Sequence, residues 1–189
     1  MEDEGRRLET FTEPRVMVEN ALYPQERRAA LEALDLHAID APIVDIVRTF
    51  AALPYCFTLQ SCWGHFICAP EQDPHTLDPV PVRHPRSVRY RIAYVGLCIE
   101  NCHSGRGLMD SLRAMTAIDP DYLQFGSADW FWERWLNSYA LQVEPARYMT
   151  RDEVVLSPAE ALHVQRTRDL FYGELRKLLA REVGEHRAG

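Results

Sequence analysis

The chain has 189 residues, of which 47% are hydrophobic and 26% are charged. This length and composition predict one globular domain over residues 1–189 that can bury a core of its own. No apolar run approaches the roughly 20 residues that a membrane-spanning helix needs, so no membrane partner is expected. The 21 basic and 28 acidic residues leave a net charge of −7, which argues against a surface that binds nucleic acid throughout.

The N-terminal residues lack a basic start followed by an apolar core, so the sequence predicts no secretory signal and a cytoplasmic location. Thiols stay reduced in the cytoplasm, and the chain has an odd number of cysteines, five. We therefore expect five free thiols.

The first half of the chain alternates between helical and extended patterns. Residues 1–20 show little periodicity and predict a loosely ordered arm. Apolar residues at helical spacing predict amphipathic helices over 25–35 and 40–52, and we expect both on the same face of a sheet. Extended segments follow at 55–61 and 89–100, separated by a proline-rich loop.

The second half predicts two further helices, a strand and a long final helix. One helix is expected over 104–115, and Ser127 is expected to cap another over 128–135. Alternation predicts a strand over 137–143, and a capping box predicts a helix over 157–183. The 128–135 helix carries Trp130, Trp132 and Trp135. The sequence therefore predicts an α+β fold: a mixed β-sheet with helices packed mainly on one face, plus a long C-terminal helix.

One stretch, residues 53–70, concentrates the residues with reactive side chains. Its first part is typical of a strand, and Trp63-Gly64 predicts a tight turn, so His65 begins the returning strand of a hairpin. On a regular strand, alternate side chains share a face. One face then carries Cys56, Thr58, Gln60 and Cys62. An inert half-buried hairpin and a hairpin that bears a site both fit this pattern.

Cys62 is the candidate nucleophile of this turn. A reactive thiolate needs a neighbouring cation or converging backbone N–H groups, and His65 and the Gly64 turn can supply both. We therefore predict Cys62 and His65 as the catalytic residues. The cysteines show no Cys-x-x-Cys spacing, so no metal is expected.

A second candidate lies where the 89–100 strand ends. Glu100 and His103 precede a helix whose first turn contains two glycines, and such corners place free N–H groups against a ligand. A plain helix cap is the alternative interpretation. The ligand-binding residues predicted from the two sites are Thr58, Ser61, Gly64, Glu100 and His103.

The basic residues gather just after the proline-rich loop. This cluster consists of Arg83, His84, Arg86, Arg89 and Arg91. Guanidinium groups bind phosphates through paired hydrogen bonds, so the cluster predicts either a phosphate-facing patch or a solvated edge strand.

The helix and the turn match the sequence pattern of a known family. The matching positions are Asp40, Pro42, Ile43, Thr58, Ser61, Cys62 and Gly64. Together they resemble the tRNA wybutosine-synthesising methyltransferase family, the enzyme type of the third step in wybutosine formation. In that family a helix opening Asp-x-Pro-Ile leads into a strand ending Thr-Thr-Ser-Ser-Cys-Ser-Gly-Arg. The resemblance covers about residues 25–115.

The resemblance implies an α+β fold with a mixed sheet and a pocket at the Ser-Cys-x-Gly turn. It also implies S-adenosylmethionine as the methyl donor and a modified guanosine in tRNA as the acceptor. Where the family has an arginine after the glycine, this sequence has His65, which removes a bidentate phosphate donor. Together with the net charge, this change predicts weak binding to bulk tRNA.

Two hypotheses about function follow. The first is a methyltransferase-like protein, a diverged relative of that family, which binds or modifies a small or nucleotide-like anionic ligand at the Ser61–His65 turn. The alternative is a non-catalytic interaction or assembly module whose Trp-rich and C-terminal helices form a partner surface or a homodimer. A pocket shared by the turn with Glu100 and His103 would favour the first hypothesis.

Overall fold

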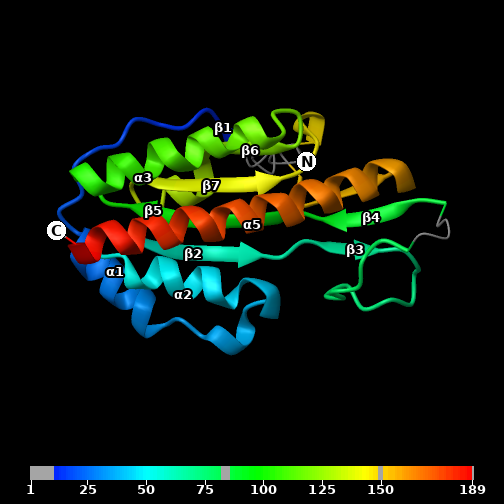
Figure 1. Cartoon of the computed structure of the whole chain (residues 1–189), viewed down its shortest axis with the longest axis horizontal. Helices are drawn as coiled ribbons and strands as arrows, with labels where there is room; N and C mark the ends of the chain where they lie inside the picture. Colours follow the sequence, from blue (N-terminus) through cyan, green and yellow to red (C-terminus); the bar gives the residue numbers. More distant parts are fainter. Residues whose placement is uncertain (1–10, 82–85, 149–150, 189) are drawn as a thin grey trace, which may run out of the picture.

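The computed structural model describes residues 11–81, 86–148 and 151–188. It combines helices with strands that form two sheets, which confirms the α+β class (Figure 1). The larger sheet has the order β1 (Phe11–Thr12), β6 (Leu123–Ala128), β7 (Ser138–Val143), β5 (Ala93–Ile99) and β2 (Cys56–Cys62). The smaller sheet has the order β3 (His65–Ile67), β4 (Val88–Arg91) and β8 (Glu153–Leu156).

All pairings among the described strands are antiparallel, whereas the sequence predicted a mixed sheet. The chain order explains the difference. The helical connection from β5 leads to β6, which is not a neighbour of β5, because β7 turns back between them. The connection therefore creates no parallel pair, although such a crossover is the usual source of one.

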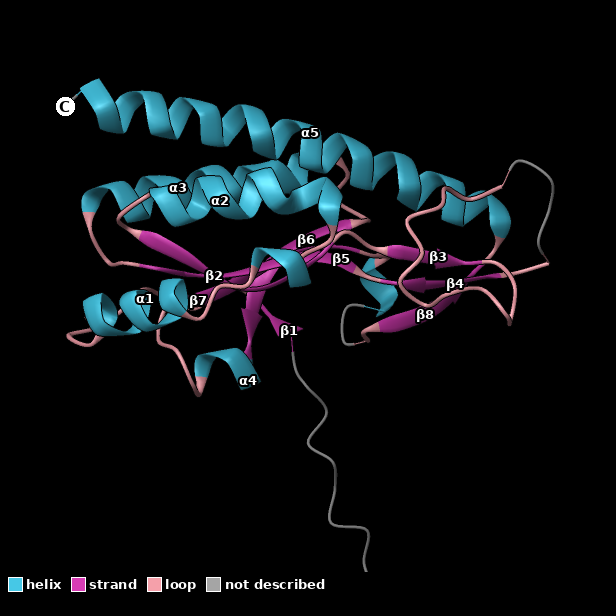
Figure 2. Cartoon of the chain, turned by 90° about the horizontal axis from the view of Figure 1, so that it is seen from below, coloured by secondary structure: helices cyan, strands magenta, loops and turns pink. Residues whose placement is uncertain are grey.

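The helices lie on both faces of the larger sheet. They are α1 (Tyr23–Glu32), α2 (Val44–Ala52), α3 (His103–Ala114), α4 (Asp129–Trp132) and α5 (Pro158–Ala188). Figure 2 shows α2, α3 and α5 on one face and α1 and α4 on the other. Short 3₁₀ turns lie at Leu36–Ala38, Ala41–Ile43, Met115–Ile118 and Ala146–Tyr148. The long α5 helix extends over both sheets, as both figures show.

The expectation that the first two helices share a face is wrong. Tyr23 of α1 packs against Phe57 and Cys98. The buried side chains of α2 belong to the main core instead, together with Leu97 and Ile99. Because β2 is an edge strand, the chain between the helices passes around it and places them on opposite faces.

Strand β2 is not regular, and this changes which side chains share a face. The first residues pair as Thr58 with Leu97, whereas the next pair is Gln60 with Gly96, so Leu59 is an extra residue. Such a bulge inverts the alternation beyond it. The prediction that Cys56 and Cys62 share a face is therefore wrong, because they lie on opposite sides of the bulge.

The predicted hairpin is also replaced by another arrangement. β2 pairs with β5 in the larger sheet, whereas β3 pairs with β4 in the smaller one. The predicted strand over 89–100 is likewise divided at Ile92, whose N–H donates to the Asp152 carbonyl. Trp63-Gly64 and Ile92 thus mark the junction of the two sheets: the segment from β2 to β3 and the segment from β4 to β5 both pass from one sheet to the other there.

Gly64 is suited to this junction because of its backbone conformation. Its φ is +90°, and a Cβ built there would lie 2.8 Å from the Cβ of Ala93. Only glycine adopts such a φ without strain, and only glycine fits this close to the neighbouring strand. The turn chemistry was therefore predicted correctly, although it joins two sheets instead of the arms of one hairpin.

Three other segments differ from their predictions. Ser127 is buried within β6 and does not cap a helix, so the tryptophan-bearing helix shortens to α4. The β8 strand has no counterpart among the predictions. Residues 11–20, expected to be loosely ordered, contribute β1 and exchange two hydrogen bonds between Val18 and the Asn137 side chain. The rest of the predicted arm, residues 1–10, lies outside the described residues.

The α3 and α5 helices and the β7 strand lie where the sequence predicted them. All five cysteines are free. Within the part of the chain that the structure describes, no helix is both long and apolar enough to cross a membrane.

Candidate active site at the junction of the two sheets

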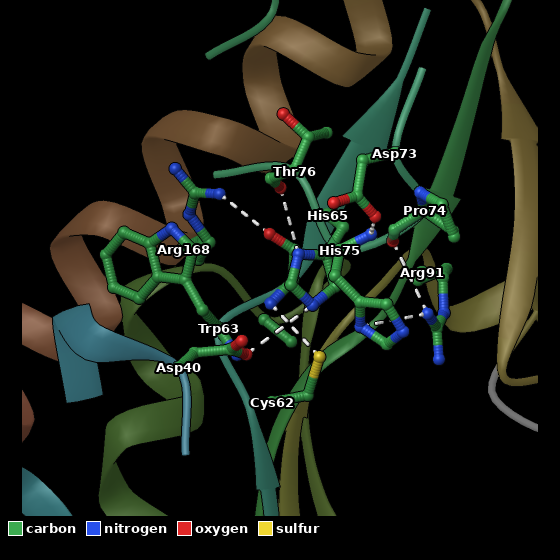
Figure 3. Close-up of polar contacts among 12 residues, drawn as sticks. Asp40, Cys62, Trp63, His65, Asp73, Pro74, His75, Thr76, Arg91 and Arg168 are labelled. Atoms are coloured by element: carbon green, nitrogen blue, oxygen red, sulfur yellow. Dashed lines mark hydrogen bonds and ion pairs between the residues drawn. The ribbon is translucent and has the colours of Figure 1, made fainter. Parts of the chain in front are cut away.

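Three side chains with different donor atoms meet where the two sheets join (Figure 3). Asp40 precedes the 3₁₀ turn before α2, Cys62 ends β2, and His65 begins β3. A carboxylate oxygen of Asp40, the Sγ of Cys62 and a ring nitrogen of His65 all lie within 4.8 Å of one another. The structure therefore brings together the two predicted catalytic residues, Cys62 and His65, and adds Asp40.

Backbone groups orient all three side chains. The Nδ1 of His65 lies 2.9 Å from the Thr76 carbonyl oxygen. A carbonyl only accepts, so Nδ1 carries the hydrogen and Nε2 faces Asp40, 3.5 Å from its Oδ2. The Trp63 N–H donates to the same Oδ2 over 2.8 Å, and the Gly64 N–H donates to Cys62 Sγ over 3.4 Å.

The electrostatics of the cluster favour an ion pair. The hydrogen bonds from His65 to Asp40 and to Cys62 raise the pKa of the imidazole to about 10, although burial opposes this shift. Burial alone would raise the pKa of Asp40, but the His65 and Trp63 hydrogen bonds outweigh it and lower that pKa. At neutral pH an imidazolium therefore faces a carboxylate beside the thiol.

Helix α5 holds the backbone of the junction in place. Arg168, which is 5% exposed, donates to the Gly64 carbonyl over 3.1 Å. Its guanidinium lies 4.2 Å from the centre of the Trp63 ring, and Trp63 stacks on Tyr172. The Tyr172 hydroxyl in turn donates to the Cys62 carbonyl. This packing fixes the backbone on both sides of the thiol.

Cys62 also lines a cavity of about 290 Å³. The residues around this cavity are Gln60, Cys62, Arg91, Ile92, Tyr94, Ala128, Phe131, Ala140, Gln142 and Asp152. Gln60, Cys62, Tyr94 and Gln142 share this face because of the bulge in β2. The bulge is therefore what turns the thiol toward the cavity.

Arg91 connects the cavity with the loop that supports His65. Its Nη1 donates to the Pro74 carbonyl over 3.3 Å and lies 3.5 Å from the His75 ring. The His75 ring meets the His65 ring edge-on, with 5.6 Å between the centres. Figure 3 shows the side chains of Arg91, His75 and His65 next to one another in this order. The positively charged guanidinium of Arg91 thus lies at the cavity wall, next to the cluster of Asp40, Cys62 and His65.

The other predicted ligand-binding residues do not join this site. Thr58 and Ser61 line a separate groove under α1. Glu100 follows the end of β5 that pairs with Cys56, whereas Cys62 pairs with Tyr94 near its start. The six residue steps from Tyr94 to Glu100 span roughly 20 Å of strand.

His103 lines another cavity, between α3 and the end of α5. The expectation of one pocket shared by the turn, Glu100 and His103 is therefore wrong. Antiparallel pairing sets the beginning of β2 beside the end of β5, so the two predicted sites lie at opposite ends of the sheet.

Sequence reasoning missed several residues of this site. Asp40 stood in the sequence only as a matching position of the family pattern at the start of the 40–52 helix, but its side chain caps no helix and accepts a hydrogen bond from the Trp63 N–H instead. Arg91 was recognised only as a member of the basic cluster, of which Arg83 and His84 lie outside the described residues. Gln142 and Asp152 carried no signal, because only the strand pairings bring them to the cavity.

No family model matches the chain, and no curated protein matches it. A solved structure, that of the PH1069 protein from Pyrococcus horikoshii, is similar to it with a TM-score of 0.41 and 14% sequence identity. The match covers 88% of this chain and 93% of that one. At this TM-score the similarity carries no argument about function.

Proposed function

We propose that this protein binds a small, anionic, nucleotide-like ligand in the cavity beside Cys62 and modifies it there. In this proposal it is a diverged relative of the wybutosine-synthesising methyltransferases that works in the cytoplasm. The observation that carries the proposal is the position of Cys62, which belongs both to the cluster with Asp40 and His65 and to the cavity wall. A set of reactive groups beside a ligand-sized cavity is the usual arrangement of an active site.

The cavity lining suits such a ligand in three ways. Arg91 offers a planar guanidinium to a carboxylate or phosphate. The side-chain amides of Gln60 and Gln142 provide both donors and acceptors, which match the edges of a nucleobase. Tyr94 and Phe131 add aromatic rings against which a base can pack.

The cavity size limits what can enter. A volume of about 290 Å³ lies at the lower end of the range for ligand pockets. It therefore suits one part of a nucleotide-like ligand, such as its base or its charged end, better than a whole dinucleotide.

The resemblance proposes methyl transfer from S-adenosylmethionine, and the cavity residues fit one end of that molecule. Arg91 matches its carboxylate and Asp152 matches its ammonium group. When bound, it supplies an electrophilic methyl group. Cys62 lines the cavity and lies next to Asp40, so it is placed to pass a proton that an acceptor loses on to the Asp40 carboxylate.

The contacts favour this function over an interaction module built on the tryptophans. Trp132 meets Tyr139 edge-on with 5.8 Å between the ring centres. Trp135 packs against the small hydrophobic cluster of Tyr23, Phe57 and Cys98. The third tryptophan of this set, Trp130, has a side chain outside the described residues. Trp132 and Trp135 thus help to hold the fold together, and the ligand hypothesis is the one to test first.

Calorimetric titration of the purified protein tests the proposal. The probes are inorganic phosphate, adenosine and guanosine monophosphate, and S-adenosylmethionine. Arg91→Gln removes the cation of the cavity, and loss of a charged hydrogen bond predicts binding that is weaker by roughly tenfold or more. Arg89→Gln is the matched control, because Arg89 lies on the same strand but pairs with Glu153 outside the cavity.

The two variants separate a specific site from general charge effects. The proposal expects at least one probe to bind the wild type and the Arg89→Gln variant equally, and the Arg91→Gln variant less. Equal weakening in both variants, or no binding of any probe, would overturn it.

A further inference from the structure

The cluster of Asp40, Cys62 and His65 has the composition of a metal site. It offers one oxygen, one sulfur and one nitrogen, all within 4.8 Å of one another. This set suits Zn²⁺, which binds carboxylate, thiolate and imidazole alike. Mg²⁺ and Ca²⁺ prefer sites made of oxygen atoms only, and iron–sulfur clusters need more thiolates.

The distances are close to those of a tetrahedral site. With zinc bonds of about 2.0–2.3 Å, neighbouring donor atoms lie roughly 3.3–3.8 Å apart. The 3.5 Å between His65 Nε2 and Asp40 Oδ2 already falls within that range. Because Cys62 Sγ lies within 4.8 Å of both partners, a shift of at most about 1 Å brings it into the same range of donor-to-donor distances.

The surroundings of the cluster are those of ligands held in place. A zinc-bound histidine usually donates its other ring N–H to a carbonyl or carboxylate, and His65 donates Nδ1–H to the Thr76 carbonyl. Asp40 and Cys62 each accept a backbone N–H, from Trp63 and Gly64 respectively. The contacts of His65 with Asp40 and with Cys62 are the ones that an ion between the three donor atoms would replace.

We propose that Asp40, Cys62 and His65 bind one Zn²⁺ ion at the wall of the cavity. The ion takes the place of the proton on His65 Nε2. Three protein ligands leave a fourth coordination position, and in catalytic zinc sites this position holds water or substrate. Since Cys62 lines the cavity, that position is accessible to an anionic ligand held by Arg91.

A bound zinc ion could activate the ligand in the cavity, and this role of the ion rests on the proposed function. The binding of the ion itself depends only on the three side chains. A metal-binding measurement and the ligand titration can therefore fail independently of each other.

The test is a titration of the full chain, stripped of metal with a chelator, with Zn²⁺ in competition with a chromophoric chelator. Co²⁺ is titrated in parallel, because its visible spectrum reports tetrahedral geometry and thiolate ligation. We expect one ion per chain and an affinity at least 100-fold lower in Cys62→Ser and in Asp40→Asn. Cys68→Ser is the control, because Cys68 is a half-buried thiol outside the cluster.

Circular dichroism shows whether each variant retains the wild-type fold. Because Cys62→Ser and Asp40→Asn each remove one zinc ligand, the test remains possible if one of the two variants fails to fold. Stoichiometric binding that Cys62→Ser and Asp40→Asn weaken but Cys68→Ser does not would confirm the site. Absence of binding by the wild type, or the same affinity in all variants, would overturn it. Zinc binding without any binding of the ligand probes would uphold this inference while refuting the proposed function.

Discussion

Glu144 is the carboxyl group whose environment predicts the clearest pH dependence. It is fully buried just after β7, and one of its oxygens accepts a hydrogen bond of 2.7 Å from Gln142, a residue of the cavity wall. Among the residues that the structure describes, the other oxygen, Oε2, has no hydrogen-bond partner. Burial, with a smaller contribution from the charge of Asp152, raises the pKa of Glu144 from 4.5 to about 9.

The sign and size of the effect follow from these two pKa values. Between pH 4.5 and 9 the folded protein keeps a proton on Glu144 that the unfolded chain has lost. Each pH unit in that window therefore lowers the free energy of unfolding by up to about 1.4 kcal/mol. From pH 5.5 to 7.5 the expected loss is at most about 2.7 kcal/mol. Above pH 9 this contribution no longer changes, because both states are ionised.

Glu144→Gln is the perturbation that isolates this effect. The amide is neutral at every pH and its oxygen can still accept from Gln142. Urea unfolding at a series of pH values should show a steeper fall in stability for the wild type than for the variant. Glu153→Gln, which changes an exposed carboxylate, should keep the wild-type slope. If Glu144→Gln has the same slope as the wild type, Glu144 is ionised in the folded protein and the reasoning is refuted.

Three further predictions concern the junction, the thiols and tRNA. Gly64→Ala should lower the free energy of unfolding by about 1–3 kcal/mol in urea titrations, because Gly64 has a positive φ. Gly107→Ala is the control and should not be destabilising, because a Cβ at this position of α3 meets open space. Cys56 and Cys98, whose thiol pKa values burial raises, should resist alkylation in the native protein and react after unfolding, as mass spectrometry can check. Filter binding across a salt series should show weak tRNA affinity; tight binding with a steep salt slope would contradict it.

Much of the fold could be predicted from local patterns. The helix near 104–115 and the final helix from 157 have apolar stripes or capping signals that belong to a few neighbouring residues. The Gly64 turn was predicted for the same reason, because only glycine adopts its φ without strain.

The arrangement of the strands could not be predicted in the same way. The bulge at Leu59 and the break at Ile92 are set by pairing with distant strands, and neither residue differs from its neighbours in a way that signals it. These two features decide which face Cys62 occupies and where the sheets separate. The candidate site was therefore predicted only in its local part, Cys62 and His65.

The distant members of the site depend on tertiary contacts. Asp40 lies 22 residues before Cys62 in the sequence and reaches the turn only because α2 packs beside β2. The prediction that Glu100 and His103 lie near Cys62 was wrong. Both follow the end of a strand, but the sequence does not say at which end of the sheet that strand end lies. Pairing register, which the sequence does not display, decides this question.

The most direct test of the central claim is whether a ligand in the cavity covers Cys62. The alkylation rates of Cys62, Cys68 and Cys102, the three half-buried thiols, can be followed by mass spectrometry with and without each probe of the ligand panel. We predict that a bound probe slows alkylation of Cys62 alone, and that Arg91→Gln removes this protection. Saturating binding that leaves the Cys62 rate unchanged, or that slows all three thiols equally, would contradict the location of the site.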